Sequence, residues 1–266
     1  MGINLIDLYY ETANLMVARL NLDVALAAQE ADLLRRSYGA ASAVNYASPV
    51  RRYVYMKMMA PRHAVIWREY TRAENLAFEE PDGTLQLNSI GAGPAPEVFG
   101  FLEGVQGALD FSRVDVRCLE SEPEWAIAGT LASELYRSMT GKDVSLTYVN
   151  SSNELHRNAY TIGSMVISDL VRAGTQGLLQ EIRKSLAPTE GLFIDTTKCR
   201  SPDTIDRFTS DYVRDLLVGR YVNFTERQYP ESMRIAMERE IDGMTHQIEY
   251  ELVTGFLYNG YRLRFT

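Results

Sequence analysis

Hydrophobic positions in the first third of the chain recur at steps of three and four residues, the spacing of one face of an α-helix. The clearest run is Leu5, Leu8, Tyr9, Met16 and Leu20, and the periodicity continues to about residue 37. Small and polar residues over 39–47 predict a loop. Ser48-Pro49 has the form of an N-cap followed by a first-turn proline, which predicts a helix from there to Pro61 and a second helix to about Asn75. We therefore expect residues 1–80 to form an N-terminal helical cap.

From residue 84 onward, short apolar runs of strand length alternate with helical periods. Helix 125–139 carries Ile127, Leu131, Leu135 and Met139 on one face and stops at Gly141. This alternation is typical of βαβ units, whose strands form a parallel sheet. The expected strands are 84–90, 114–119, 144–149, 165–171 and 191–196, and the expected helices are 96–109, 125–139, 176–186 and 201–217.

The C-terminal part has a different pattern. A strand-like run over 247–258 is followed by Asn259-Gly260 and a second run over 261–265, and Asn-Gly between apolar runs predicts a β-hairpin. We expect an α/β domain over 81–266, with a seven-stranded, mostly parallel, doubly wound (Rossmann-like) sheet that ends in an antiparallel hairpin. Residues 219–246 are interpreted as an insertion, with a strand over 221–224 and a helix over 231–242.

The segment around residue 90 carries the clearest functional signal. The first strand runs into Gly91-Ala92-Gly93, and a helix begins almost immediately, at Pro96. Glycines allow a sharp turn and a close approach to a ligand, and a helix N-terminus presents unpaired N–H groups. This arrangement favours a ligand-binding turn at the carboxyl end of the strand.

The sequence Gly91-Ala92-Gly93-Pro94-Ala95-Pro96-Glu97 resembles the glycine-rich first motif of class I S-adenosylmethionine-dependent methyltransferases. The resemblance implies S-adenosylmethionine as the cofactor, with Gly91 and Gly93 against its methionine portion and Ala92 and Pro94 also in the cofactor site. Ser89 stands where the commoner motif has an acid, and Ala95 where it has a third glycine. Glu97 is the candidate to meet the ammonium group of the cofactor instead.

Further positions follow from the family layout. Glu120 stands at the end of the second strand, where a carboxylate accepts both ribose hydroxyls; the alternative is that Glu120 belongs to a solvated acidic run. Trp125 is a cofactor contact or a core residue. The layout also places Asn150 and Ser151 near the adenine, Ser168 in the cofactor site, and Asp169 beside the acceptor as its orienting group or base, or else as an exposed loop acid.

A nicotinamide-dependent dehydrogenase uses a similar strand–turn–helix unit. Its G-x-G-x-x-G pattern would require glycine where this chain has Pro96, which lacks an N–H for a phosphate. No P-loop Gly-Lys-Ser/Thr occurs. Methyl transfer is therefore favoured, and the alternative is a non-catalytic module that binds S-adenosylmethionine or serves as a scaffold.

Composition narrows the acceptor only slightly. The formal net charge of −8 disfavours a nucleic-acid substrate, because such proteins usually present a basic face to phosphates. The three histidines are far apart in the sequence and give no support for a metal site. The chain shows neither a signal peptide nor a run of 18 apolar residues, so a cytoplasmic protein without membrane contact is expected. The acceptor, a small molecule or a protein side chain, and the oligomeric state are left open.

Overall fold

The structure is a computed structural model of the 266-residue chain. It describes residues 2–37, 45–74, 83–105, 111–164, 176–186, 189–196, 217–225, 234–241, 244–251 and 256–265.

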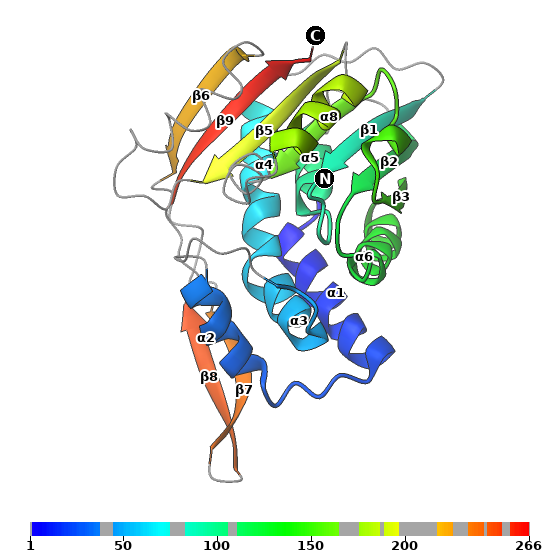
Figure 1. Cartoon of the computed structure of the whole chain (residues 1–266). Helices are drawn as coiled ribbons and strands as arrows, with labels where there is room; N and C mark the ends of the chain where they lie inside the picture. The colour runs from blue at the N-terminus through cyan, green and yellow to red at the C-terminus, as the bar shows by residue number, and fades with distance from the viewer. Residues whose placement is uncertain are drawn as a thin grey trace.

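A seven-stranded mixed sheet forms the centre of the fold, with the strand order β3-β2-β1-β4-β5-β9-β6 (Figure 1). The first five strands in this order are parallel, and β9 runs antiparallel to both β5 and β6. The α/β class, the mostly parallel sheet and its antiparallel end are as predicted. The strands are β1 (Thr84–Ile90), β2 (Arg113–Leu119), β3 (Asp143–Val149), β4 (Tyr160–Ser164), β5 (Glu190–Thr196), β6 (Leu217–Thr225) and β9 (Phe256–Arg264).

The fourth strand of the chain is displaced from its predicted place. It spans Tyr160–Ser164, whereas the strand predicted over 165–171 lies outside the described residues. The predicted helix over 201–217 also lies outside them, except for Leu217, which begins β6. β4 begins with Tyr, Thr and Ile, residue types that favour strands, but it ends in Gly-Ser and is too short for a periodic signal to stand out.

Two predictions near the C-terminus were wrong. Asn259-Gly260 is not a hairpin turn, because β9 continues through both residues, which pair with β5 on one side and β6 on the other. The predicted helix over 231–242 is replaced by β7 (Arg234–Ile241), which pairs with β8 (Met244–Glu251) in a separate two-stranded sheet beside α2. The predicted strand over 221–224 is the middle of β6.

Helices form the N-terminal segment and alternate with the strands after it. Asn4 caps α1, and Ser48 accepts the Arg51 N–H ahead of Pro49, so α3 begins where the sequence predicts. The predicted helix over 96–109 ends at Gly104 among the described residues. The helices are α1 (Leu5–Leu20), α2 (Ala27–Ser37), α3 (Pro49–Met58), α4 (Ala60–Glu74), α5 (Pro96–Gly104), α6 (Trp125–Thr140) and α8 (Gln176–Leu186), with a 3-10 turn η1 (Ser152–Glu154). None of the described helices is both long and apolar enough to span a membrane.

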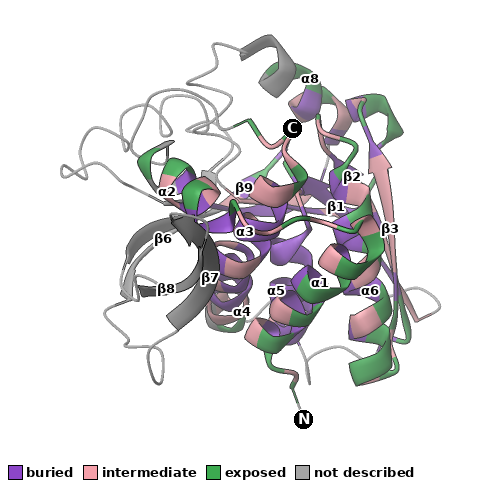
Figure 2. Cartoon of the chain, turned by 90° about the horizontal axis from the view of Figure 1, so that it is seen from below, coloured by how far each residue is buried: buried purple, intermediate pink, exposed green. Residues whose placement is uncertain are grey.

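The two faces of the sheet pack into separate cores. In β5, Leu192 and Ile194 belong to the larger core with α1 to α6, whereas Phe193 belongs to a smaller core with Ile182 and Leu186 of α8. This division follows from the strand geometry, in which successive side chains point to opposite faces. Figure 2 shows the buried residues gathered between the helices and the sheet, with exposed residues on the outer sides of α1, α2 and α6.

The buried face of α6 is not the face that carries the large apolar residues of the sequence pattern, Ile127, Leu131, Leu135 and Met139. Ile127 and Met139 are 39% and 43% exposed. The face that packs inward is composed largely of small residues between two aromatic ones, which lets α6 lie close to α1 and β3. Its buried residues are Trp125, Ala128, Gly129, Ala132, Ser133 and Tyr136.

Glycines also set the close crossing of α4 and α5. A Cβ atom added at Gly100 would lie 2.2 Å from the Ala64 carbonyl oxygen and 2.6 Å from the Trp67 Cβ. One turn later, a Cβ at Gly104 would lie 2.6 Å from the Thr71 Cβ. The backbones of α4 and α5 are therefore in direct contact at Gly100 and Gly104. This contact holds α5, which follows β1 and the glycine turn, against α4.

We predict that Gly100→Ala destabilises the protein, although alanine is the better helix former by about 1 kcal/mol. The Ala64 carbonyl cannot yield without moving α4, so the overpacking should cost about 3 kcal/mol, the upper end of the usual range, and outweigh the gain in helix propensity. Urea unfolding measures the difference, with Thr130→Ala on the exposed face of α6 as a control that should stay within about 0.5 kcal/mol of wild type. A Gly100→Ala variant as stable as wild type would contradict the close packing of α4 on α5.

Candidate functional site

The ends of neighbouring strands lie in register at one edge of the sheet. Ile90 pairs with Leu119, Leu119 pairs with Val149, and on the other side of β1 Ile90 pairs with Gly163. The register continues past the strands, because the Leu119 carbonyl accepts the next N–H after β1 at 2.8 Å and the Val149 carbonyl accepts the next N–H after β2 at 3.0 Å. The next residues in register are therefore neighbours, in the order Asn150, Glu120, Gly91 and Ser164, of which Ser164 is the last residue of β4 and the other three follow their strands.

This edge contains the position where the strand order reverses. From β1 the chain proceeds to β2 and β3 on one side, and then crosses to β4 on the other. In open α/β sheets, ligands bind outside the carboxyl ends of the strands at such a switch point. Four strand ends span three spacings, or about 14 Å, which suits an elongated ligand laid across them.

The glycine turn leaves β1 with three residues in the left-handed region. Gly91 and Gly93 have φ angles of 65° and 48°, and Ala95 has 58°. A residue other than glycine pays roughly 1–2 kcal/mol for that conformation, so Ala95 holds strained backbone at the N-cap of α5. Gly91 is exposed at the strand end, and a Cβ at Gly93 would lie 4.0 Å from Trp125 Cε2. Gly91 is therefore exposed at the edge, whereas Ala92 and Pro94 are buried and Gly93 is half-buried beside the Trp125 ring.

Glu120 is bound to this turn. Its Oε2 accepts the Gly93 N–H at 2.8 Å, and its Oε1 accepts the Glu122 N–H at 3.0 Å and the Ser121 hydroxyl at 3.2 Å. A carboxylate has about four acceptor directions, so Oε2 keeps one for a further donor. Glu120 is half-buried, whereas Glu124 in the same acidic run is exposed.

Glu97 lies under the turn, in the first turn of α5. It is 1% exposed, and the Ser89 hydroxyl donates to its Oε1 at 2.5 Å. Burial raises the pKa of Glu97 to about 8, and the nearby Glu120 charge adds to the shift, against the Ser89 hydrogen bond that lowers it. Ser89 and Glu97 are therefore one buried pair, and Glu97 brings a carboxyl group beside residue 89.

An aromatic cluster lies next to the turn. The centroid of the Trp125 ring is 5.4 Å from that of Tyr46 and 5.3 Å from that of Tyr55. The Tyr46 and Tyr55 rings pack edge to face with their centroids 5.3 Å apart. The Tyr55 hydroxyl is 3.2 Å from Nδ1 of His63. Burial, with the neighbouring Arg62 charge, lowers the pKa of His63 to about 3, so its imidazole is neutral. Trp125 is 2% exposed, so it is a core residue, and it also borders the turn.

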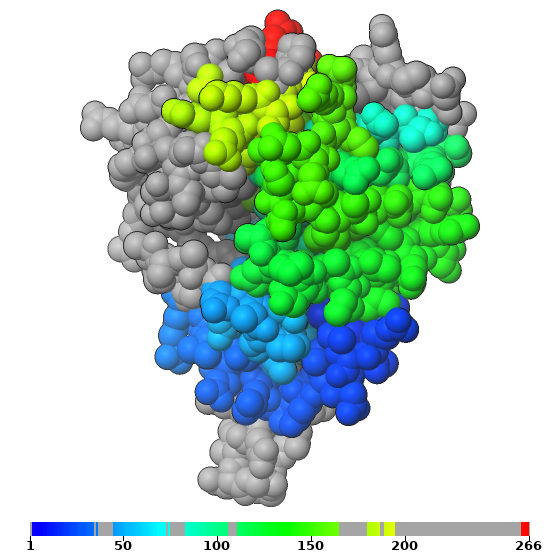
Figure 3. Space-filling model, turned by 45° about the vertical axis from the view of Figure 1, so that its right-hand side comes forward, coloured from blue at the N-terminus to red at the C-terminus, as the bar shows by residue number. Residues whose placement is uncertain are grey.

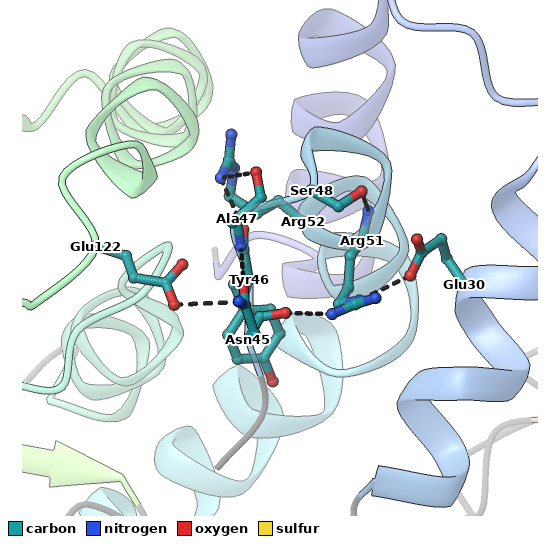
Figure 4. Close-up of polar contacts among 8 residues, drawn as sticks. All are labelled: Glu30, Asn45, Tyr46, Ala47, Ser48, Arg51, Arg52 and Glu122. Carbon is teal, nitrogen blue, oxygen red and sulfur yellow. Dashed lines mark hydrogen bonds and ion pairs between the residues drawn. The ribbon is translucent and has the colours of Figure 1, made fainter.

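Residues 45–48 connect this cluster to the edge of the sheet (Figure 4). Glu122 accepts the Tyr46 N–H at 3.2 Å, and Arg52 donates to the Tyr46 carbonyl at 2.7 Å. Arg51 joins the Asn45 carbonyl to Glu30 of α2. The N-terminal helices and segment 111–164 accordingly form one continuous surface (Figure 3).

The sequence-predicted site residues divide into two groups. Gly91, Ala92, Gly93, Pro94, Glu97 and Glu120 are brought together around the turn, and Asn150 and Ser151 follow β3 at the same edge. Asn150 is exposed, and the half-buried Ser151 accepts the Asn153 N–H with its side chain. Ser168 and Asp169 lie outside the described residues.

Sequence reasoning missed three residues of the site. Ser164 occupies the end of β4 and accepts a hydrogen bond from Nε1 of Trp67. The hydroxyls of Tyr148 and Tyr9 donate to the carbonyls of Gly93 and Pro94. A strand assigned to residues 160–164 would have indicated Ser164, whereas the two tyrosines lie 55 and 85 residues away from their partners and leave no local signal.

Comparisons with known proteins give matches of structure only: no family model and no curated protein matches the sequence. Many matching solved structures are class I S-adenosylmethionine-dependent methyltransferases. A candidate enzyme of this class from Listeria monocytogenes matches with 10% identity and a TM-score of 0.47, covering 99% of this chain and 87% of that chain. Magnesium protoporphyrin IX methyltransferase from Synechocystis, solved with bound S-adenosylmethionine, matches with 11% identity and a TM-score of 0.38, covering 90% and 97%. The tRNA (m1A58) methyltransferase from Aquifex aeolicus matches with 10% identity and a TM-score of 0.41, covering 75% and 68%. Because the identities are 10–11% and the TM-scores are below 0.5, these matches say nothing about the chemistry of the site. Its chemistry has to be argued from this chain's own residues.

The buried Glu97 generates a prediction about pH. Its pKa is raised in the folded protein from an ordinary 4.5 to about 8, so the folded state binds the proton more tightly than the unfolded state. The free energy of unfolding should therefore fall as pH rises from about 4.5 to 8 and level off above that range, by on the order of 5 kcal/mol for this group.

Urea unfolding of wild type and Glu97→Gln between pH 5 and 9 isolates this contribution. The amide does not ionise, so the stability difference between variant and wild type should shift in favour of the variant as pH rises. A difference that stays constant across the range would show that Glu97 does not titrate there.

Proposed function

We propose that this protein is an S-adenosylmethionine-dependent methyltransferase that acts on a small molecule or a protein side chain. The observation that carries the proposal is the register of the strand ends. It sets the glycine turn, Glu120 and Asn150 side by side at the switch point of the sheet, with Glu120 bonded to Gly93.

The residues at this edge fit the parts of the cofactor in order. The spare acceptor direction of Glu120 Oε2 suits a ribose hydroxyl, since charge-assisted bonds to a carboxylate are strong. Asn150 and Ser151, at the end of the adjacent strand, are assigned to the adenine. The turn over Gly91-Ala92-Gly93-Pro94 is assigned to the methionine portion, because Gly91 is exposed there without a side chain.

Glu97 is assigned to the ammonium group of the cofactor. The family motif has an acid where this chain has Ser89, and the hydrogen bond between Ser89 and Glu97 places a carboxyl group beside that position. A cation bound nearby would favour the ionised form of Glu97 and lower its pKa. In this proposal the carboxyl is supplied from α5 instead of β1.

A pyrophosphate suits the turn less well. Pro96 begins α5 and lacks an N–H, and the Val98 N–H is already bonded to the Ala95 carbonyl at 3.2 Å. The first turn of α5 therefore offers fewer donors than a dinucleotide site uses. This supports S-adenosylmethionine over a nicotinamide cofactor.

The bound cofactor supplies an electrophilic methyl group on its sulfonium. The chain's own residues hold the acceptor in line with that methyl group, and such positioning accounts for much of the rate of a displacement reaction. Ser168 and Asp169 remain proposed for the end of the cofactor site and the orientation of the acceptor. We assign residues 1–80 as a helical cap on the methyltransferase domain of residues 81–266, with an insertion near 219–246.

We predict that S-adenosylhomocysteine stabilises the protein. Ligand at 100 times its dissociation constant adds about 2.7 kcal/mol to the free energy of unfolding, enough for a rise of about 5 °C or more in Tm. NAD and ATP at the same concentration should give no comparable shift, because Pro96 removes a phosphate donor and no P-loop lysine is present. The absence of any shift with millimolar S-adenosylhomocysteine would contradict the proposal.

We predict that Glu120→Ala weakens the binding of S-adenosylhomocysteine by about 10- to 100-fold, because charge-assisted hydrogen bonds contribute about 1.5–3 kcal/mol. The variant also frees the Gly93 N–H, so the unliganded protein should lose about 1 kcal/mol of stability. Calorimetric titration gives the affinities.

Glu124→Ala is the matched control, because Glu124 belongs to the same acidic run but is exposed. It should bind S-adenosylhomocysteine as wild type does. Equal affinities for the two variants would mean that Glu120 does not receive the ribose.

A further inference from the structure

We propose that Tyr148 and Tyr9 are positioning residues, whose hydroxyls fix the carbonyls of the glycine turn before the cofactor binds. The inference rests on the proposed function, because it concerns the same turn. It also gives α1 a part in the cofactor site, in addition to its packing against α6.

Tyr148 of β3 and Glu120 both form hydrogen bonds with Gly93. The Tyr148 hydroxyl donates to the Gly93 carbonyl at 2.7 Å, and Glu120 accepts the Gly93 N–H at 2.8 Å. Both polar groups of Gly93 are thus bound to side chains from adjacent strands. The peptide planes on either side of Gly93 cannot rotate without breaking one of these bonds.

The Tyr148 hydroxyl fits against α6 because residue 129 is a glycine. A Cβ atom at Gly129 of α6 would lie 2.1 Å from the Tyr148 hydroxyl oxygen, 2.9 Å from Cζ and 3.0 Å from Cε2. Any side chain at residue 129 would displace the hydroxyl from the Gly93 carbonyl. Two observations therefore agree on the position of the Tyr148 hydroxyl: α6 has a glycine at residue 129, where a side chain would displace the hydroxyl, and the hydroxyl is bonded to the Gly93 carbonyl.

Tyr9 of α1 binds the next carbonyl along the chain. It is 0% exposed, and its hydroxyl donates to the Pro94 carbonyl at 3.3 Å. Its ring packs edge to face on Phe99 of α5 with the centroids 6.3 Å apart. Burial raises the pKa of both tyrosines well above the usual value, so both hydroxyls remain donors at physiological pH.

The two hydroxyls occupy the carbonyl acceptors of the turn. The Gly93 and Pro94 carbonyls each accept a tyrosine hydrogen bond, which partly compensates their negative charge before any ligand binds. A ligand carrying a carboxylate, such as the methionine portion of the cofactor, is then repelled less by these two carbonyl dipoles. Because the turn is ordered during folding, little ordering remains to oppose binding.

The test compares S-adenosylhomocysteine affinity with unliganded stability in three Tyr→Phe variants. Tyr148→Phe keeps the ring and removes one hydrogen bond, so its dissociation constant should rise about 5- to 10-fold. Tyr9→Phe, with the longer bond, should give a rise of about 2- to 5-fold. Tyr136→Phe is the control, because its buried hydroxyl donates to Glu103 at 2.9 Å, away from the turn. It should lower the unfolding midpoint as Tyr148→Phe does while leaving the affinity within about twofold of wild type.

Gly129→Ala extends the test through a double-mutant cycle. Alone it should weaken binding at least as much as Tyr148→Phe, because it pushes the hydroxyl off Gly93. In the Tyr148→Phe background it should weaken binding much less, since the nearest atom has been removed; independent, multiplying effects would overturn the inference. Wild-type affinity in Tyr148→Phe would also overturn it while leaving the proposed function intact. A wild-type protein that does not bind S-adenosylhomocysteine would overturn both.

Discussion

Ile90, Leu119 and Val149 pair side by side at the carboxyl ends of three parallel strands, and this register positions the glycine turn, Glu120 and Asn150 of the candidate site. A slip of one residue would turn each strand's side chains to the opposite face of the sheet. Leu87 and Val116 would then leave the larger core, and Ser89 would no longer face Glu97 on α5. The same burial that stabilises the sheet therefore fixes the register, and the register places Glu120 against the glycine turn.

Behind the turn, the protein keeps polar groups in an otherwise apolar core. The Ser89–Glu97 pair lies on one side of β1, and on the other side Asn88 exchanges hydrogen bonds with the His156 backbone and reaches Thr161. Buried polar groups are costly unless they are bonded, so these contacts restrict how β1 can lie between its neighbours. The left-handed backbone of Ala95 and the raised pKa of Glu97 both lie at the end of β1, and features of this kind gather where proteins bind ligands, which supports the proposed cofactor site.

The parts of the fold that could be predicted from the sequence are those with a strong local signal. Strand β1 and helix α8 have the predicted bounds, because each has a clear period and definite end signals. Residues 231–242 contain apolar and charged residues that suit either a helix or a strand, and pairing with β8 decided in favour of β7. Asn259-Gly260 lies between two partner strands, and their hydrogen bonds override the local turn preference. In the candidate site, the motif indicated the turn and Glu120. Ser164 was missed because the short strand β4 gave no periodic signal, whereas Tyr9 and Tyr148 depend on long-range contacts that one sequence does not reveal.

The most direct test of the account is a crystal structure of the protein with S-adenosylhomocysteine. The account predicts one ribose hydroxyl on the Oε2 atom of Glu120, the adenine beside Asn150 and Ser151, and the homocysteine portion along Gly91 to Pro94, with the tyrosine bonds to the turn retained. A ligand bound elsewhere on the sheet, or at this edge with Glu120 turned away from the ribose, would contradict it.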